Sequence, residues 1–257
     1  MAKVALFANG AVGIDVAKYL IDNGDEIVKL YLHEPAKQLC VPEIIANSKV
    51  ETKDIIVWDK AYSEDTIQAL RDVQPDFIIT IYWAYLLKPV LLDIAKIGTV
   101  NFHPSLLPIN RGWYPHVHSF LDDTPFGVTL HSMDAGADTG PIWVQKEVVP
   151  APTDNAGDIY KRLEREIFDM FKMHWEYIKT GQLQLTPQDH SKAIYRKKEE
   201  VDKFDCIDLD KKYTARELIN IFKARTFGSR GFAYYKDESG EKVYMHIQLA
   251  RTNNFSQ

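Results

Sequence analysis

Cysteine is scarce in this sequence: among its 257 residues only Cys40 and Cys206 occur, far apart and without a Cys-x-x-Cys spacing. A disulfide scaffold and a cysteine-based zinc site are therefore not expected. The chain also lacks any run near the roughly 18 apolar residues of a membrane-spanning helix, and its first residues lack the apolar region of a signal peptide. We expect a cytoplasmic protein with no membrane partner.

Excess positive charge is absent too. The chain has 31 Lys and Arg against 36 Asp and Glu, a formal net charge of -5. Proteins that bind nucleic acids neutralise phosphates with Lys and Arg, and the one short basic cluster, residues 195–198, is followed at once by Glu199 and Glu200. We therefore expect no nucleic-acid partner.

What is present is an ordinary globular composition, with 46% hydrophobic and 26% charged residues. In roughly the first hundred residues, short β-rich apolar runs alternate with amphipathic segments, which is typical of βα units that build a parallel sheet. The pattern predicts strands at 4–7, 27–32, 55–57, 77–81 and 97–102, and helices at 12–21 and 66–73. The fold class is α/β, with a Rossmann-like, mostly parallel sheet.

The pattern changes after residue 126. Residues 128–133 and 142–148 read as adjacent strands joined by a loop rich in Gly and Asp, and 154–179 reads as one long helix. A helix at 214–224 and strands at 231–236 and 243–249 predict a small α+β module. We therefore expect a catalytic domain over 1–188 and a C-terminal module over 189–257.

The densest group of chemically interpretable residues lies at the end of the fifth predicted strand. Residues two apart in a strand point the same way, so Asn101 and His103 should project together from the carboxyl edge of the sheet, where open α/β sheets bind ligands. Pro104 and Pro108 stiffen the chain that follows. This arrangement suits a site that must hold its groups still.

The run Asn101-Phe102-His103-Pro104-Ser105-Leu106-Leu107-Pro108, with Asp138 later in Asp138-Thr139-Gly140-Pro141, resembles the signature of the formyltransferases that use 10-formyltetrahydrofolate. The resemblance is close over residues 75–150 and implies that Asn101, His103 and Asp138 are catalytic. The chemistry agrees, because an imidazole can accept the proton of an attacking amine and an amide NH2 can stabilise an oxyanion. Asp138 would orient the imidazole. No metal is implied.

The resemblance also implies where the substrates bind. N10-formyltetrahydrofolate is expected against the loop after the fourth strand and the loop before Asp138, at Tyr82, Trp83, Ala84, Tyr85, Leu86, Asp134 and Gly136. The segments at 110–131 and 223–235 are most similar to the sugar N-formyltransferases that act on dTDP-, UDP- or GDP-linked 4-amino-4,6-dideoxy sugars. Residues expected to bind that nucleotide-linked amino sugar are Arg111, Gly112, Trp113, Tyr114, Arg225, Phe227 and Arg230. The oligomeric state that we consider for this protein is a homodimer.

Other hypotheses fit parts of the sequence. Methionyl-tRNA and glycinamide ribonucleotide formyltransferases share the motif, but the acidic balance disfavours the first and the extra C-terminal module the second. A metal-dependent hydrolase could be built from His103, His116, His118, His131, Asp134 and Asp138, although neither His-Glu-x-x-His nor Gly-x-Ser-x-Gly occurs. Gly10, Gly13 and Glu34 give an incomplete dinucleotide fingerprint. A binding module without catalysis is the remaining alternative.

Overall fold

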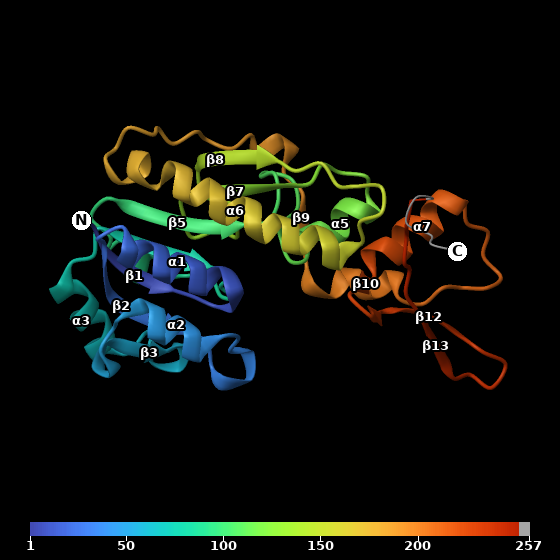
Figure 1. The fold of residues 1–257 in the computed structure, drawn as a ribbon, viewed down its shortest axis with the longest axis horizontal. Coiled ribbons are helices and arrows are strands. Elements are labelled where there is room, and N and C mark those ends of the chain that lie inside the picture. Colours follow the sequence, from blue (N-terminus) through green and yellow to red (C-terminus); the bar gives the residue numbers. More distant parts are fainter. Residues whose placement is uncertain (252–257) are drawn as a thin grey trace. The chain divides into compact units, whose positions relative to one another are not determined.

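The computed structural model describes residues 1–251 of the chain. Its largest feature is a seven-stranded sheet with the strand order β3-β2-β1-β4-β5-β7-β8 (Figure 1). Its strands are Lys3–Phe7 (β1), Glu26–Leu32 (β2), Ile55–Val57 (β3), Phe77–Ile81 (β4), Gly98–His103 (β5), Gly127–His131 (β7) and Ile142–Glu147 (β8). β1 to β5 pair in parallel and β7 is antiparallel to β5. The predicted Rossmann-like, mostly parallel sheet is confirmed.

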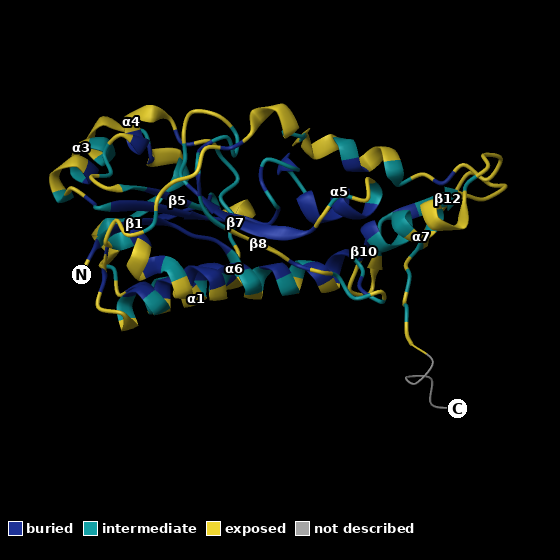
Figure 2. Cartoon of the chain, turned by 90° about the horizontal axis from the view of Figure 1, so that it is seen from above, coloured by how far each residue is buried: buried dark blue, intermediate teal, exposed yellow. Residues whose placement is uncertain are grey.

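Helices cover both faces of this sheet. Figure 2 shows α1 and the second half of α6 on one face and α3 and α4 on the other. The helices are Gly10–Asp22 (α1), Val41–Ser48 (α2), Glu64–Val73 (α3), Pro89–Leu92 (α4), Pro115–Leu121 (α5), Ala156–Lys179 (α6) and Ala215–Ala224 (α7). Within residues 1–251, none of them combines the length and the apolar character that crossing a bilayer requires.

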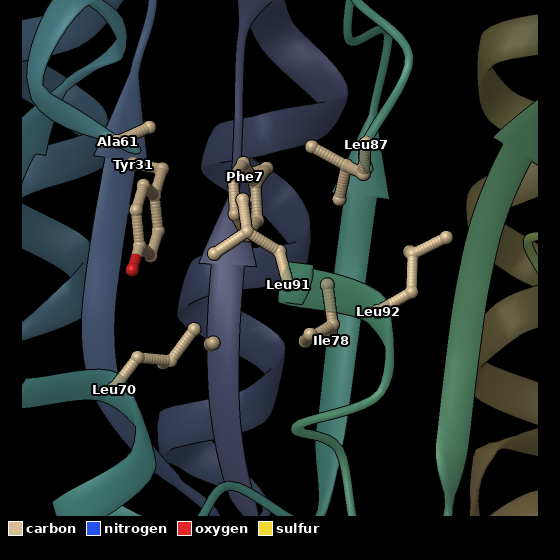
Figure 3. Packing of buried hydrophobic residues seen from close by; sticks show 9 residues of the cluster. Phe7, Tyr31, Ala61, Leu70, Ile78, Leu87, Leu91 and Leu92 are labelled. Atoms are coloured by element: carbon tan, nitrogen blue, oxygen red, sulfur yellow. The ribbon is translucent and has the colours of Figure 1, made fainter. Parts of the chain in front are cut away.

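The core beside the parallel strands is built from aromatic and aliphatic side chains. Phe7 of β1 stacks on Tyr31 of β2 with ring centroids 4.0 Å apart, and Ile78 of β4 lies on the other side of Phe7 (Figure 3). All five residues of β4 are buried, as expected for a strand covered on both faces. This packing fixes the strand ends from which the candidate site projects.

Several predicted elements have different bounds in the structure, and two of the differences have a visible cause. α6 begins at Ala156 and not at residue 154, because the Asn155 side chain accepts hydrogen bonds from the backbone of Gly157 and Asp158 and so caps the helix. The predicted strand at 243–249 is shorter: β13 spans Lys242–Met245, and Ile247 donates its N–H to the Thr226 hydroxyl instead of to a neighbouring strand.

Short strands complete the remainder of the chain. Arg111–Gly112 (β6) pairs with Tyr195–Arg196 (β9), and Thr226–Phe227 (β10) pairs with Arg230–Gly231 (β11). Ala233–Lys236 (β12) and β13 form an antiparallel hairpin. A helix and antiparallel strands thus make up the small C-terminal part, as the sequence pattern predicted.

The chain divides into two compact units. The first contains Met1–His103, Thr129–Gln145 and Ile167–Gln188, and the second contains Pro104–Val128, Lys146–Glu166 and the chain from Asp189 on. The division into a catalytic domain over 1–188 and a module over 189–257 stays a prediction, and residues 252–257 of that module lie outside the described part.

Candidate active site

β5 and the loop between β7 and β8 bring together the three residues predicted to be catalytic. Asn101 and His103 lie on β5. The Asp138 carboxylate in the loop approaches both: Oδ2 lies 3.5 Å from His103 Nδ1, and Oδ1 accepts a hydrogen bond of 3.3 Å from Asn101 Nδ2. His103 is buried and the Asp138 side chain is 16% exposed, so their charges are only partly screened by water.

His131 belongs to the same cluster, although the sequence pattern pointed to it only as a hypothetical metal ligand. It stands directly opposite Asn101 in the antiparallel β5–β7 pair. Its Nδ1 lies 2.7 Å from the Ser132 carbonyl oxygen, which can only accept, so Nδ1 carries a proton. On the other side of the ring, Nε2 lies 2.9 Å from Asn101 Nδ2 and 3.5 Å from Asp138 Oδ1.

Thr80 of β4 fixes the orientation of the Asn101 amide. Its hydroxyl donates to Asn101 Oδ1 at 2.6 Å. The two N–H groups of Asn101 therefore face His131 and Asp138, because the amide oxygen is already turned to Thr80. The amide is thus held as a donor at the carboxyl edge of the sheet, the role that stabilising a developing oxyanion requires.

The β7–β8 loop that carries Asp138 is tightly wound. Asp138 has a positive φ of 53°, a conformation that costs energy for a residue other than glycine. A Cβ at Gly140 would lie 2.0 Å from the Ser132 carbonyl oxygen, so the close approach of these segments requires glycine. The predicted folate residues Asp134 and Gly136 shape the same loop, since Asp134 Oδ1 accepts from the Gly136 N–H at 3.0 Å and from the Thr139 hydroxyl.

The loop after β4, which contains the other residues predicted to bind folate, lies in an aromatic cluster. The Trp83 ring stacks on His33 with centroids 4.0 Å apart, and the Tyr85 ring stacks on Trp58 at 4.7 Å. Ala84 donates its N–H to His33 Nε2 at 3.1 Å, while Leu86 is exposed. Tyr82, the first residue of the loop, has a φ of 48°.

His33 holds this loop as a neutral acceptor. Burial lowers the pKa of His33 to about 4, the Glu34 carboxylate opposes this shift and Lys37 adds to it. Met133 of the loop preceding Asp138 packs against the same core cluster as Trp83. The two segments predicted to bind folate therefore pack against a common core cluster of the first unit.

The residues predicted to bind the sugar nucleotide lie in the second unit. Arg111 is buried in β6 and donates to His190 Nδ1 at 3.0 Å. Gly112 has a φ of 87°, and a Cβ there would lie 2.4 Å from the Arg196 carbonyl oxygen. The backbone N–H of Trp113 donates to that same carbonyl at 3.1 Å, and Tyr114 is the N-cap of α5.

Arg225, Phe227 and Arg230 lie close to one another in the second unit. Arg225 is buried and forms a bidentate ion pair with Asp205, at 2.5 and 3.0 Å. Phe227 and Arg230 are opposite each other in the β10–β11 pair and both are exposed. Exposure leaves Phe227 and Arg230 accessible to a ligand, whereas Arg225 already has a carboxylate partner.

The groups proposed for a metal hydrolase do not assemble in the described part of the chain. Among residues 1–251, no three His, Cys, Asp or Glu side chains are placed to hold a metal ion. His116 lies in α5 of the second unit, where burial, His118 and Arg225 lower its pKa to about 3. His103, His131 and Asp138 lie in the first unit.

The first unit thus places an Asn, a His and an Asp together at the carboxyl edge of a mostly parallel α/β sheet. The family model described as "Formyl transferase" matches residues 27–170, and "N-formyltransferase dimerization C-terminal domain" matches residues 200–251. The first match covers more than half of the chain, so the protein belongs to the formyl transferase family and is a formyltransferase.

Individual relatives agree with this assignment. A dTDP-4-amino-4,6-dideoxyglucose formyltransferase from Mycobacterium bovis is 28% identical over 68% of this chain and 73% of its own length. Methionyl-tRNA formyltransferases also match, over 42% to 67% of their own length. The structure of a 4-N formyltransferase from Francisella tularensis aligns with a TM-score of 0.81 and 25% identity, over 97% of this chain and 98% of that one.

Similar solved structures also include complexes with ligands. A formyltransferase from Anoxybacillus kamchatkensis, in complex with UDP-4,6-dideoxy-4-formamido-L-AltNAc and tetrahydrofolate, aligns with a TM-score of 0.57 and 27% identity, over 78% of this chain and 88% of that one.

Proposed function

We propose that this protein is a sugar N-formyltransferase. It transfers the formyl group of N10-formyltetrahydrofolate to the amino group of a nucleotide-linked 4-amino-4,6-dideoxyhexose. The observation that carries the proposal is the cluster of Asn101, His103 and Asp138 at the carboxyl edge of the sheet. The match of residues 200–251 to the C-terminal domain of N-formyltransferases supports the same class.

The cluster can perform direct transfer without a covalent enzyme intermediate. The amine nitrogen attacks the formyl carbon and the C=O electron pair moves to oxygen. An Asn101 N–H that leaves its long 3.3 Å bond to Asp138 then stabilises the oxyanion. His103 accepts the amine proton, and a carboxylate 3.5 Å from Nδ1 stabilises the imidazolium that forms. When the carbonyl re-forms, the C–N10 bond breaks and the proton passes to N10 of tetrahydrofolate.

The folate part of the proposal rests on two loops. Trp83 and Tyr85 are partly exposed, and the aromatic cluster that they form with His33 and Trp58 gives a pterin or a p-aminobenzoyl ring an apolar surface. A ligand placed against the neighbouring Met133 would reach Asn101, since Thr80 contacts both Met133 and Asn101. The relative from Anoxybacillus kamchatkensis was solved with tetrahydrofolate. We assign Tyr82, Trp83, Ala84, Tyr85, Leu86, Asp134 and Gly136 to this side of the site.

The sugar-nucleotide part rests on the second unit and on the relatives. The name of one relative contains a dTDP-linked 4-amino sugar, and another relative was solved with a UDP-linked 4-formamido sugar. We assign contact with the diphosphate to Arg230 and stacking to Trp113, Tyr114 or Phe227, while Arg111, Gly112 and Arg225 shape the surrounding backbone. The C-terminal match further supports a homodimer. A cytoplasmic location stays a prediction.

An acceptor screen tests the proposal. Purified protein is incubated with N10-formyltetrahydrofolate and, separately, with dTDP-, UDP- and GDP-linked 4-amino-4,6-dideoxyhexoses, glycinamide ribonucleotide and methionyl-tRNA. We expect tetrahydrofolate and a formamido sugar to appear in equal amounts with at least one sugar nucleotide. Formylation of methionyl-tRNA or glycinamide ribonucleotide alone would refute the sugar acceptor and leave the formyltransferase class intact.

A further inference from the structure

We propose that Gln188 is a positioning residue that holds Asp138 in its working conformation. The proposal rests on the role assigned to Asp138 in the proposed function. Gln188 follows α6 at the end of the first unit, and neither the sequence motif nor any resemblance points to it. Its side chain reaches the loop that carries Asp138 from a segment 50 residues further along the chain.

The geometry assigns both protons of the Gln188 amide. Nε2 donates to the Asp138 carbonyl oxygen at 2.9 Å and to the Gly140 carbonyl oxygen at 2.6 Å. Both partners are carbonyls, which can only accept, so only the NH2 end of the amide can face them. Gln188 is buried, so the two bonds are protected from competition with water.

Gln188 is itself firmly anchored. Thr186, two residues earlier, forms a pair of backbone hydrogen bonds of 2.8 and 2.9 Å with Ile142, at the start of β8. The Ser132 N–H donates to the Pro141 carbonyl at 2.8 Å and closes the other side of the loop. Gln188 therefore spans the loop from an element that pairs with the sheet.

The conformation of Asp138 explains why such a brace is needed. Its positive φ is unfavourable for a residue with a side chain, so the isolated loop would relax toward other conformations. Bonds to the carbonyls of Asp138 and Gly140 constrain the backbone on both sides of the strained residue. A displacement of the carboxylate by about 1 Å can cost a reaction a factor of about 100.

The first test removes the donors and keeps the size of the side chain. In Gln188→Met, we expect kcat for formyl transfer to fall about 10- to 100-fold while the KM values for both substrates change less than about threefold. Gln184→Met is the matched control, since Gln184 is exposed in the same segment, and it should leave kcat unchanged. The thermal midpoint of each variant corrects kcat for any loss of folded protein.

The second test uses pH. The carboxylate that Gln188→Glu introduces would repel both carbonyls, whereas a protonated carboxyl can donate one hydrogen bond to either of them. In this variant, we therefore expect kcat relative to wild type to recover as pH falls from about 8 to 5.5. A residue with a merely structural role would give no such recovery. If Gln188→Met yields no soluble protein, Gln188→Glu alone tests the inference.

A double-mutant cycle separates this inference from the proposed function. If Gln188 acts through Asp138, Gln188→Met should add no further loss of kcat in an Asp138→Asn background. Full activity of Asp138→Asn alone would overturn the role of Asp138. If Asp138→Asn loses activity, three results would each overturn the inference about Gln188. They are a wild-type kcat in Gln188→Met, a ratio of kcat to wild type that does not change with pH in Gln188→Glu, and additive losses in the double variant.

Discussion

The indole N–H of Trp175 donates a 2.7 Å hydrogen bond to the carboxylate of Asp25, 150 residues earlier in the chain. Asp25 also accepts from the Ala2 N–H at 2.7 Å and from Lys179 at 3.1 Å. Burial raises the pKa of Asp25, but these donors and Asn23 outweigh it, so the net pKa lies below the usual value. The ionised carboxylate therefore joins the residue before β1 to α6, and protonation would weaken these bonds.

We expect Asp25→Asn to lower the free energy of unfolding by about 2 kcal/mol at pH 7, because charged hydrogen bonds in a buried site are lost. A pKa that is lowered in the folded state adds stability above the unfolded pKa, near 3.8, and this stability is lost as pH falls through the folded value. Urea unfolding should therefore show the difference from wild type shrinking below about pH 4. A difference that stays constant down to pH 3 would contradict this account.

The neutral state of His33 gives a prediction about the loop after β4. Its folded pKa, about 4, lies below the unfolded value near 6.5, so the unfolded chain binds more protons between these values. Stability should rise with pH across that window, and His33→Gln, whose Oε1 can take the place of Nε2 as acceptor for the Ala84 N–H, should remove this part of the rise. An NMR titration of the His33 ring should give a midpoint near 4. A midpoint near 6.5 would contradict the lowered pKa on which this prediction rests.

Thr80 tests the orientation of the Asn101 amide. Without this hydroxyl, Asn101 Oδ1 loses its donor, and only the bonds of Nδ2 to His131 and Asp138 still orient the amide. The N–H groups are then held less firmly in the orientation that the oxyanion requires. We expect Thr80→Val to lower kcat about tenfold with KM values within about threefold, and Thr80→Ser to restore most of the activity. Steady-state kinetics under saturating folate donor measure both variants. Equal kcat in the Val and Ser variants would show that the hydroxyl has no part in the reaction.

The sheet and the pairing of Asn101 with His103 could be predicted because their signals are local. β4 is a β-rich run that is apolar except for Thr80, and Asn101 and His103 are two apart on one strand. Asp138, 35 residues after His103, was predicted only from the resemblance to a known family. The short helices α2 and α5 were not predicted, because each has only about two turns and begins with proline in its first turn. At that length the apolar pattern does not distinguish a helix from a loop.

The remaining residues of the site depend on contacts that no local pattern encodes. His131 joins Asn101 through the antiparallel register of β5 and β7, and a shift of one residue would turn it to the other face. Gln188 reaches Asp138 across 50 residues. For Gln188 the sequence contains no signal.

Arg225 directly precedes β10 and Arg230 begins β11, and the structure predicts opposite consequences for their loss. Arg225 is buried against Asp205, so Arg225→Ala leaves a carboxylate without its partner and should lower the free energy of unfolding by about 2 kcal/mol or more. Arg230 is exposed, with its guanidinium 4.6 Å from the Phe232 ring centre, so Arg230→Ala should leave the thermal midpoint unchanged. If Arg230 meets the diphosphate, KM for the sugar nucleotide should rise about tenfold in that variant and KM for folate should not change. Thermal unfolding and steady-state kinetics on both variants test which arginine contacts the nucleotide. A raised KM for the sugar nucleotide with a native thermal midpoint in Arg225→Ala would assign that contact to Arg225 and not to Arg230.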